Sequence, residues 1–182
     1  MKKTDIVTIA VMGGIIALGV LYIFFFQDQS EVQQRQNTPA AQALLPPEDV
    51  QSFTDLAGQP FSVSESFGSV MVVMTWASWC PLCAADFAPY GDIATEYKDR
   101  GVVFYALNRG EDPYSAERFL ATIDEPTSVR YILDPSDYFF AQSEGYAMPE
   151  TIVYNKEGGV VLRQHGSLRP DELRTVLNNI LE

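Results

Sequence analysis

The sequence predicts an α/β domain with a mixed central sheet and helices on both faces, preceded by one N-terminal transmembrane helix. Residues 6–26 contain no charged side chain. Residues 70–75 and 102–107 are almost continuously apolar, as expected of central strands that are covered on both faces. A helix-like segment follows each run, and a hairpin and a last helix close the chain, so parallel crossovers and an antiparallel pair share one sheet.

Composition limits the classes of function that this chain can have. Its 182 residues suit one domain with a tail, and a formal net charge of −12 disfavours a nucleic-acid partner. Two cysteines and one histidine, His165, are too few for a four-ligand zinc site or an iron–sulfur cluster within the chain. We therefore expect no metal ion and no cofactor, and we expect His165 to be a surface residue rather than a ligand.

The N-terminal segment predicts a membrane anchor over residues 1–27. The uncharged run at residues 6–26 reaches the roughly 20 residues that a helix needs to cross a bilayer. Lys2 and Lys3 precede it and Asp28 follows it, so the positive-inside rule leaves the N-terminus in the cytoplasm and the body outside.

A cleaved signal peptide is the alternative to this anchor. The apolar run is longer than an ordinary signal core, and the nearest Ala-x-Ala, at residues 41–43, lies well beyond it. Residues 28–49 are rich in Gln, Ala and Pro and indicate a flexible linker. The folded domain is expected over residues 50–182.

The first half of this domain is predicted to contain a hairpin, two strands and a helix. Residues 52–63 alternate around a Gly-containing turn, which favours a short hairpin. The first apolar strand, at residues 70–75, leads to a helix over residues 81–99, where Pro81 suits the first turn and Pro89 should cause a kink. Residues 102–107 form the second apolar strand.

The second half is predicted to be a short helix, a strand, a helical turn, a hairpin and a closing helix. The expected bounds are a helix over 113–123, a strand over 131–133 and a helical turn over 136–143, followed by paired strands over 151–154 and 160–163. Residues 170–181 carry apolar side chains at helical spacing on one face, which predicts the last helix.

Cys80 and Cys83 carry the chemistry. They lie where a strand gives way to a helix, and a cysteine at a helix N-terminus meets unpaired N–H groups that favour its thiolate. We expect Cys80 to be the nucleophile and Cys83, one turn later, the resolving thiol. Three alternatives remain open: a structural disulfide, a two-thiolate Cu(I) site and a peroxidase.

The motif Trp76-Ala77-Ser78-Trp79-Cys80-Pro81-Leu82-Cys83, with a proline before the last hairpin, resembles the thioredoxin fold. With the anchor, it is similar to extracytoplasmic thiol–disulfide oxidoreductases of the TlpA, ResA and CcmG type. Residues 146–151, Tyr-Ala-Met-Pro-Glu-Thr, resemble the Pro-Glu-Thr element of the CcmG-type branch. The resemblance spans residues 50–182.

This resemblance implies roles for several further residues. Pro149 matches the family's cis-proline, which turns the backbone of Met148 towards the cysteines for substrate pairing. Asp86 stands where the family often has a glutamate that assists proton transfer, and Glu150 is a candidate for tuning Cys83 or selecting partners. The remaining expected substrate-binding residues surround the cysteines: Trp76, Trp79, Pro81 and Leu82.

The expected function is that of a single-pass protein of the bacterial cell membrane whose domain faces the periplasmic side. It would act as a thiol–disulfide oxidoreductase, most simply a disulfide reductase for selected protein thiols, as in cytochrome c maturation. A membrane electron donor is the expected second partner. The alternatives are a Cu(I)-binding or delivery module that uses the same cysteines, and a protein disulfide oxidant.

Overall fold

A computed structural model of the chain describes residues 22, 53–61, 66 and 68–182. The predicted anchor and linker therefore lie outside the described residues, apart from Tyr22, which is helical. Among the residues that the structure does describe, no helix combines the length and the apolar composition needed to cross a bilayer. The chain divides into two units, residues 1–37 and 38–182, and every described residue except Tyr22 belongs to the second unit.

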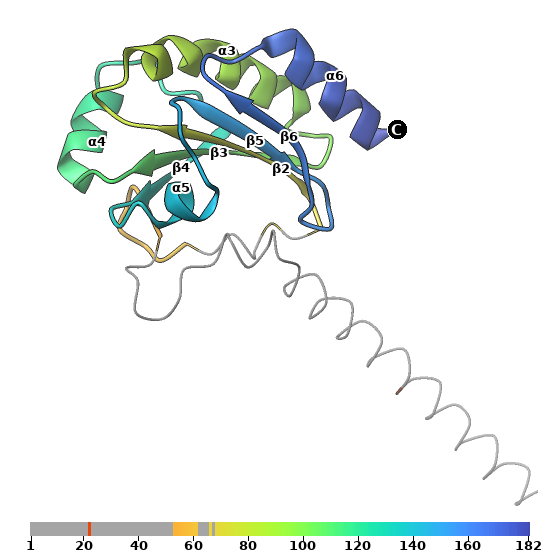
Figure 1. The fold of residues 1–182 in the computed structure, drawn as a ribbon, viewed down its shortest axis with the longest axis horizontal. Helices are drawn as coiled ribbons and strands as arrows, with labels where there is room; N and C mark the ends of the chain where they lie inside the picture. Colours follow the sequence, from red (N-terminus) through yellow and green to blue (C-terminus); the bar gives the residue numbers. More distant parts are fainter. Residues whose placement is uncertain (1–21, 23–52, 62–65, 67) are drawn as a thin grey trace, which may run out of the picture. The chain divides into compact units, whose positions relative to one another are not determined.

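The second unit is built on a six-stranded mixed sheet (Figure 1). In spatial order the strands are β1 (Thr54–Asp55), β4 (Val129–Asp134), β3 (Val102–Arg109), β2 (Val70–Trp76), β5 (Glu150–Tyr154) and β6 (Val160–His165). Strands β2, β3 and β4 are parallel, whereas β1, β5 and β6 each run antiparallel to their inner neighbour. The predicted combination of parallel crossovers with a terminal hairpin is confirmed.

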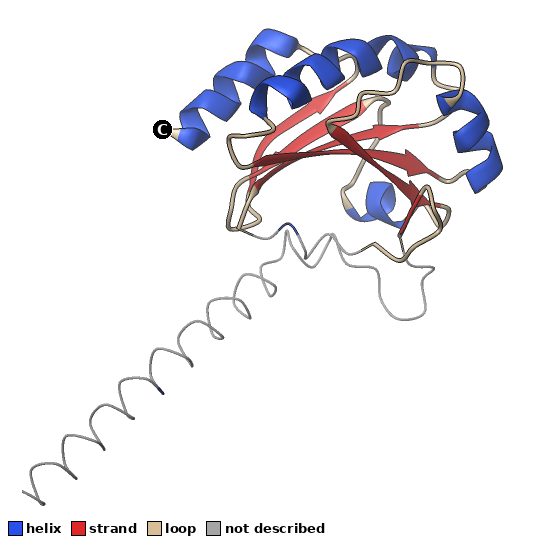
Figure 2. Ribbon diagram, turned by 180° about the vertical axis from the view of Figure 1, so that it is seen from behind, coloured by secondary structure: helices blue, strands red, loops and turns tan. Residues whose placement is uncertain are grey.

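Helices cover both faces of this sheet, as predicted. They are α3 (Pro81–Tyr97), α4 (Pro113–Leu120), α5 (Tyr138–Gln142) and α6 (Pro170–Leu181). Helices α3 and α6 lie side by side on one face, and α5 lies on the other (Figures 1 and 2). The predicted N-terminal hairpin is present in a shortened form. Strand β1 is followed by a turn and by a single bridge between Thr54 and Pro60.

Strand alternation divides the apolar side chains into two cores. Val72, Met74 and Trp76 of β2 face α3 and α6 and pack with both cysteines in the larger core. Met71 and Val73 face the opposite way and pack with Phe139 of α5 in the smaller core. The run of β2 is apolar almost throughout because both of its faces are buried.

The centre of α3 fits closely against its surroundings. The buried hydroxyl of Tyr90 donates towards the carbonyl oxygens of Val72 and Tyr105, which ties the helix to β2 and β3. Gly91, the next residue, faces Pro126 so closely that a Cβ atom at position 91 would overlap the proline ring. Helix α3 thus has a fixed position over the sheet, and its N-terminus carries the cysteines.

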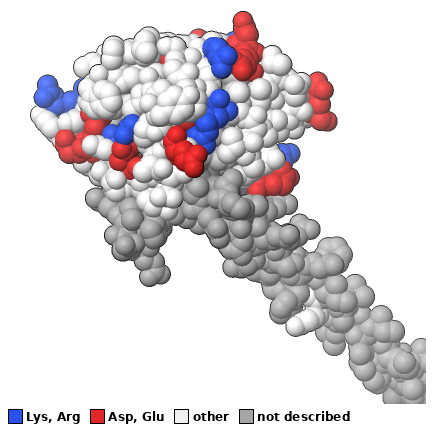
Figure 3. Space-filling model, in the orientation of Figure 1, with Lys and Arg blue, Asp and Glu red and all other residues white. Residues whose placement is uncertain are grey.

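Charged side chains of both signs are interspersed on the face of the domain shown in Figure 3. Some charged side chains of the domain form ion pairs, such as Arg174 of α6 with Glu96 of α3, whose N–O distance is 2.8 Å. Local pairing of this kind offsets part of the repulsion that the excess of acidic residues creates.

Candidate active site

Cys80 and Cys83 form a disulfide at the point where β2 passes into α3. The S–S distance is 2.06 Å and the Cα atoms are 5.3 Å apart. Cys80 is the N-cap of α3 in an extended conformation, Pro81 occupies the first helical position, and Cys83 lies in the first turn. The predicted placement of the pair is confirmed.

The start of α3 suits a thiolate at Cys80. The Sγ atom of Cys80 accepts a hydrogen bond of 3.1 Å from the backbone N–H of Cys83. The first turn of α3 contains no acidic side chain, so no carboxylate there opposes the positive end of the helix dipole. After reduction, the same N–H group and dipole favour the charged form of Cys80.

Only one of the two cysteines lines a recess at the surface. The recess has a volume of about 390 Å³ and is lined by residues 79–82, Arg109, Phe140 and residues 146–148. Cys80 belongs to this lining and keeps 4 % of its surface exposed, whereas Cys83 has none. An incoming thiol or disulfide therefore meets Cys80 first.

An apolar rim surrounds this recess, formed by Trp79, Leu82 and Tyr146. Their side chains are exposed by 65 %, 51 % and 77 % respectively, although each is large and apolar or aromatic. Trp76, in contrast, is fully buried and packs edge to face on Phe87 at a centroid distance of 5.2 Å. Among the predicted contact residues, Trp79 and Leu82 thus face solvent and Trp76 supports the core.

The peptide bond between Met148 and Pro149 is cis, as the resemblance implied. Met148 lines the recess beside Cys80, and the carbonyl oxygen of Pro149 accepts a hydrogen bond of 2.8 Å from Gly166 N–H. The segment before β5 is thereby attached to the end of β6, and it forms the wall of the recess opposite α3.

Asp86 lies one turn after Cys83 on the buried side of α3. Its Oδ2 atom accepts a hydrogen bond of 2.7 Å from the backbone N–H of Leu168. Burial raises the pKa of the Asp86 carboxyl, and the bond from Leu168 offsets part of that effect. A group of this kind keeps its proton to higher pH than an exposed aspartate does.

Glu150 lies on the face of the sheet opposite α3. The next residue, Thr151, pairs with Met74 of β2, which packs with the cysteines. Because successive side chains of a strand point to opposite faces, Glu150 and its own partner Thr75 lie on the other face. The fully buried carboxylate of Glu150 forms an ion pair of 2.7 Å with Arg163, and His165 Nδ1 lies 3.2 Å from the same oxygen.

These contacts bear on two of the predictions. The effect of Glu150 on Cys83 stays a prediction, since the described ion pairs of the Glu150 carboxylate are with Arg163 and His165 of β6. The ring of His165 lies 4.0 Å from that of Tyr146, centroid to centroid, so the histidine is half-buried beneath the apolar rim rather than at a free surface.

Two further residues belong to the site, and neither was predicted from the sequence. Arg109 ends β3 and lines the recess. Glu111, two residues later, accepts hydrogen bonds from Ser78 N–H and from the Asn108 amide. The signal was present in the order of the elements, because the carboxyl ends of parallel strands meet at one edge of a sheet, and β3 is parallel to the strand that carries the cysteines.

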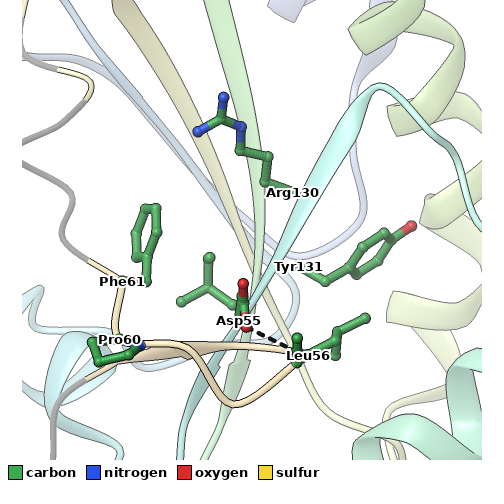
Figure 4. Close-up of a pocket in the computed structure, with 8 residues that line it drawn as sticks. Asp55, Leu56, Pro60, Phe61, Arg130 and Tyr131 are labelled. Atoms are coloured by element: carbon green, nitrogen blue, oxygen red, sulfur yellow. Dashed lines mark hydrogen bonds between the residues drawn. The ribbon is translucent and has the colours of Figure 1, made fainter.

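A second, larger hollow of about 520 Å³ lies at the edge of the sheet, beside β1 and β4 (Figure 4). Phe61 and Tyr131 lie on opposite sides of it, with Asp55 and Pro60 below and Arg130 above in that view. Neither cysteine lines this hollow. The larger hollow is therefore not the candidate active site. The smaller recess is the candidate, because Cys80 lines it.

A parallel–antiparallel sheet, a disulfide at the start of α3 and a cis-proline beside it define a thioredoxin-fold thiol–disulfide oxidoreductase. The chain belongs to the Redoxin family, whose profile matches residues 36–180. It is similar to the thiol-disulfide oxidoreductase ResA of Bacillus cereus, with 22 % identity over 160 residues that cover 88 % of this chain and 86 % of the relative.

Two further comparisons agree with this assignment. ResA of Bacillus subtilis is 24 % identical over 126 residues, which are 69 % of each chain. The crystal structure of a putative thiol:disulfide interchange protein DsbE from Chlorobium tepidum superposes with a TM-score of 0.64 and 25 % identity, and covers 76 % of this chain and 99 % of that one. The predicted relationship to the ResA and CcmG type is thus confirmed.

Proposed function

We propose that this chain is a membrane-anchored, extracytoplasmic disulfide reductase that keeps the thiols of selected proteins reduced through a Cys80/Cys83 dithiol–disulfide cycle. The observation that carries the proposal is the one-sided disulfide, in which Cys80 lines the recess and Cys83 is fully buried. Such an arrangement orders the chemistry, because a partner contacts one sulfur and the other remains available for resolution.

The cycle begins with reduced Cys80 and Cys83. The Cys80 thiolate attacks one sulfur of a partner disulfide, the partner's S–S bond breaks, and a mixed disulfide forms as the second partner sulfur leaves as a thiolate. Cys83 then loses its proton and attacks Cys80 Sγ, which releases the first partner sulfur. Two electrons have passed to the partner, and the Cys80–Cys83 disulfide must be reduced by a dithiol donor at the membrane.

Asp86 is the group that we assign to proton transfer at Cys83. It shares the buried side of α3 with Cys83. Because its pKa is raised, the Asp86 carboxyl can still exchange a proton at pH values where an exposed aspartate is already ionised. In the second step the ionised carboxylate of Asp86 accepts the proton of the Cys83 thiol. The proton then passes to the released partner thiolate or to water, which regenerates the ionised carboxylate.

A trapping experiment in the native host tests this proposal. Cys83→Ala removes the resolving thiol, so Cys80 should accumulate mixed disulfides with a small set of extracytoplasmic proteins. The matched control, Cys80→Ala, should capture none. If neither variant forms a mixed disulfide, catalytic exchange by this pair is refuted; if Cys80→Ala captures the partners instead, the assigned roles of the two cysteines are reversed.

The proposed substrates are apocytochrome c segments that carry paired cysteines, an assignment based on the Pro-Glu-Thr resemblance at residues 149–151. The proposed anchor is residues 1–27, joined by residues 28–49 to the domain at 50–182. Fractionation of host cells should leave the full chain in the membrane. Recovery of a soluble form that begins near residues 42–46 would instead favour a cleaved signal peptide.

Copper binding and disulfide oxidation by the same cysteines are tested separately. Met148, a soft ligand beside the pair, already accepts a hydrogen bond of 3.4 Å from Arg109 Nη1, so its sulfur has a cationic neighbour, which disfavours Cu(I) binding there. Titration of the reduced chain with Cu(I) and measurement of its rate of insulin-disulfide reduction distinguish copper binding from thiol–disulfide exchange. Tight Cu(I) binding without insulin reduction would refute the oxidoreductase function. Equilibration with glutathione buffers gives the direction of electron flow.

A further inference from the structure

Among the residues that the structure describes, Arg109 is the one charged residue that lines the recess beside Cys80. It is the last residue of β3. The other lining positions are residues 79–82, Phe140 and the segment 146–148, and their side chains are apolar, aromatic or sulfur-containing. A partner segment whose cysteine reaches Cys80 therefore meets an apolar surface with a single cationic point.

Three groups hold the guanidinium of Arg109 in one orientation. Its Nε atom donates to Asp137 Oδ1 at 2.9 Å, and Nη2 donates to Oδ2 of the same carboxylate. Nη1 donates to the Sδ atom of Met148 at 3.4 Å. The charged plane also lies over the ring of Phe140, with the Cζ atom 3.5 Å from the ring centroid. An arginine fixed in this way loses little freedom when it binds a further group.

The guanidinium retains donors for a ligand. Arginine has five N–H groups, and the hydrogen bonds to described residues use three of them. One N–H on each Nη atom has no hydrogen-bond acceptor within the part of the chain that the structure describes. Two N–H groups on one planar cation match the two oxygens of a carboxylate, and an arginine can bind carboxylates along more than one edge.

We propose that Arg109 determines specificity by selecting partner segments that carry Asp or Glu close to the cysteine that exchanges with Cys80. This inference rests on the proposed reductase function and names the substrate class of the same site. The carboxylate of the partner binds the free Nη groups while its cysteine reacts with Cys80. Because the chain has a net charge of −12, the overall field repels an acidic segment, and its binding depends on this local contact.

Asp137 is the competitor that limits this selection. Its carboxylate neutralises the guanidinium charge, and its side chain is 32 % exposed. The backbone of Asp137 has a φ of 56°, a region in which asparagine is also well tolerated. Asp137→Asn therefore removes the competing charge in a conformation that the new residue accepts, and it should strengthen the binding of an acidic partner.

The test uses the full-length chain in detergent, reduced beforehand, and two peptides that each contain an internal disulfide. The peptides are identical except that one has Glu and the other Gln next to the first cysteine. Single-turnover rates of peptide reduction give a Glu-to-Gln ratio for each protein variant. We expect a ratio of about ten for the wild-type chain, because Gln can accept one hydrogen bond from the guanidinium but lacks the negative charge and the second acceptor oxygen of Glu.

Three variants make this ratio decisive. Arg109→Gln should lower it to one or below, Asp137→Asn should raise it, and Arg118→Gln should leave it unchanged. Arg118 is the matched control because it also lies beside an aromatic ring, that of Tyr114, but does not line the recess. A structural role for the Arg109–Asp137 pair alone would change both rates together and leave the ratio constant.

The outcomes separate this inference from the function on which it rests. Equal rates with the two peptides, or a ratio that survives Arg109→Gln, overturn the specificity assignment and leave the reductase function intact. If the wild-type chain reduces neither peptide while it also fails to reduce insulin, the proposed function is wrong and the inference falls with it.

Discussion

Ser78 and Glu111 are joined by two hydrogen bonds, although Ser78 follows β2 and Glu111 follows β3. The backbone N–H of Ser78 donates to Glu111 Oε2 at 2.8 Å, and its hydroxyl donates to Oε1 at 2.5 Å. The Asn108 amide donates to Oε2 as well, at 2.7 Å. One carboxylate thus fixes the loop that leads from β2 into Cys80.

Glu111→Ala should weaken both the fold and the exchange reaction. Three donors lose their acceptor, and we expect the free energy of unfolding to fall by about 1–3 kcal/mol in urea titrations. The attack of Cys80 should slow as well, since the loop before it is less well fixed. Ser78→Ala is the matched variant: it removes the hydroxyl bond alone and should have a smaller effect. A variant at position 111 that matches the wild type in both measurements would refute this role.

Asp86 makes the stability of the domain depend on pH. Its pKa is raised by burial, so the folded state binds the proton more tightly than the unfolded chain does. The associated stabilisation is complete below the ordinary pKa of 3.8 and is lost as the pH rises through the raised value. Asp86→Asn cannot ionise and should therefore gain stability relative to the wild type as the pH rises from about 3 to about 7.

Urea denaturation at a series of pH values measures this effect. Asp92→Asn, an exposed change on the same helix, controls for the removal of one negative charge from α3. A difference between Asp86→Asn and the wild type that stays constant across the pH range would contradict the assignment. The same change in a chain that keeps both cysteines should slow the resolution of the mixed disulfide by Cys83, because the proposed proton acceptor of Cys83 can no longer ionise.

Removing Arg163 should destabilise the domain more than removing the charge of Glu150. Glu150 is fully buried, so Arg163→Ala leaves its carboxylate without the arginine and beside His165, and should cost about 3–5 kcal/mol. Glu150→Gln leaves an arginine whose side chain is 30 % exposed and can reach water, and the cost should be smaller. The double variant should recover part of the loss of Arg163→Ala. Equal costs for the two single variants would show that burial does not control this pair.

Gly91→Ala tests the close approach of α3 to the loop before β4. The added methyl group would overlap Pro126, and overpacking of this kind costs about 1–3 kcal/mol, more than the gain in helix propensity. Thermal unfolding should show the loss. Combination with Pro126→Gly removes the obstacle and should restore stability, whereas strictly additive effects of the two changes would show that the residues do not interact.

Most of the architecture was predictable because local patterns and tertiary environment agree. Residues 70–75 are apolar at every position but one and form the buried core of β2, and Pro170–Leu181 is a helix with the predicted bounds. The ends of other elements shifted. The strand predicted at 131–133 extends over Val129–Asp134, because pairing with β3 continues through the charged Arg130. The helix predicted at 113–123 ends at Leu120, and a turn follows.

The parts of the site that consist of residues close together in the sequence were predictable. The parts that are brought together by tertiary contacts were not. The position of the cysteines and the match at Pro149 come from short motifs of consecutive residues. The face on which Glu150 lies depends on the register of β5 against β2, which the alternation of one short strand does not specify. Arg109 and Glu111 had the composition of an ordinary polar loop. Only the parallel pairing of β2 and β3 brings Arg109 to the recess beside Cys80 and Glu111 to Ser78.

The apolar rim has a consequence for how the protein behaves at high concentration. Trp79, Leu82 and Tyr146 are displayed to solvent together, and exposed groups of this kind promote adhesion between molecules. The chain carries 24 acidic and 12 basic residues, so two copies that approach each other repel. Colloidal stability therefore depends on charge and should decline as salt shortens the Debye length to about 3 Å near 1 M. Self-association through the apolar rim would block access to Cys80, and charge repulsion between copies opposes that association.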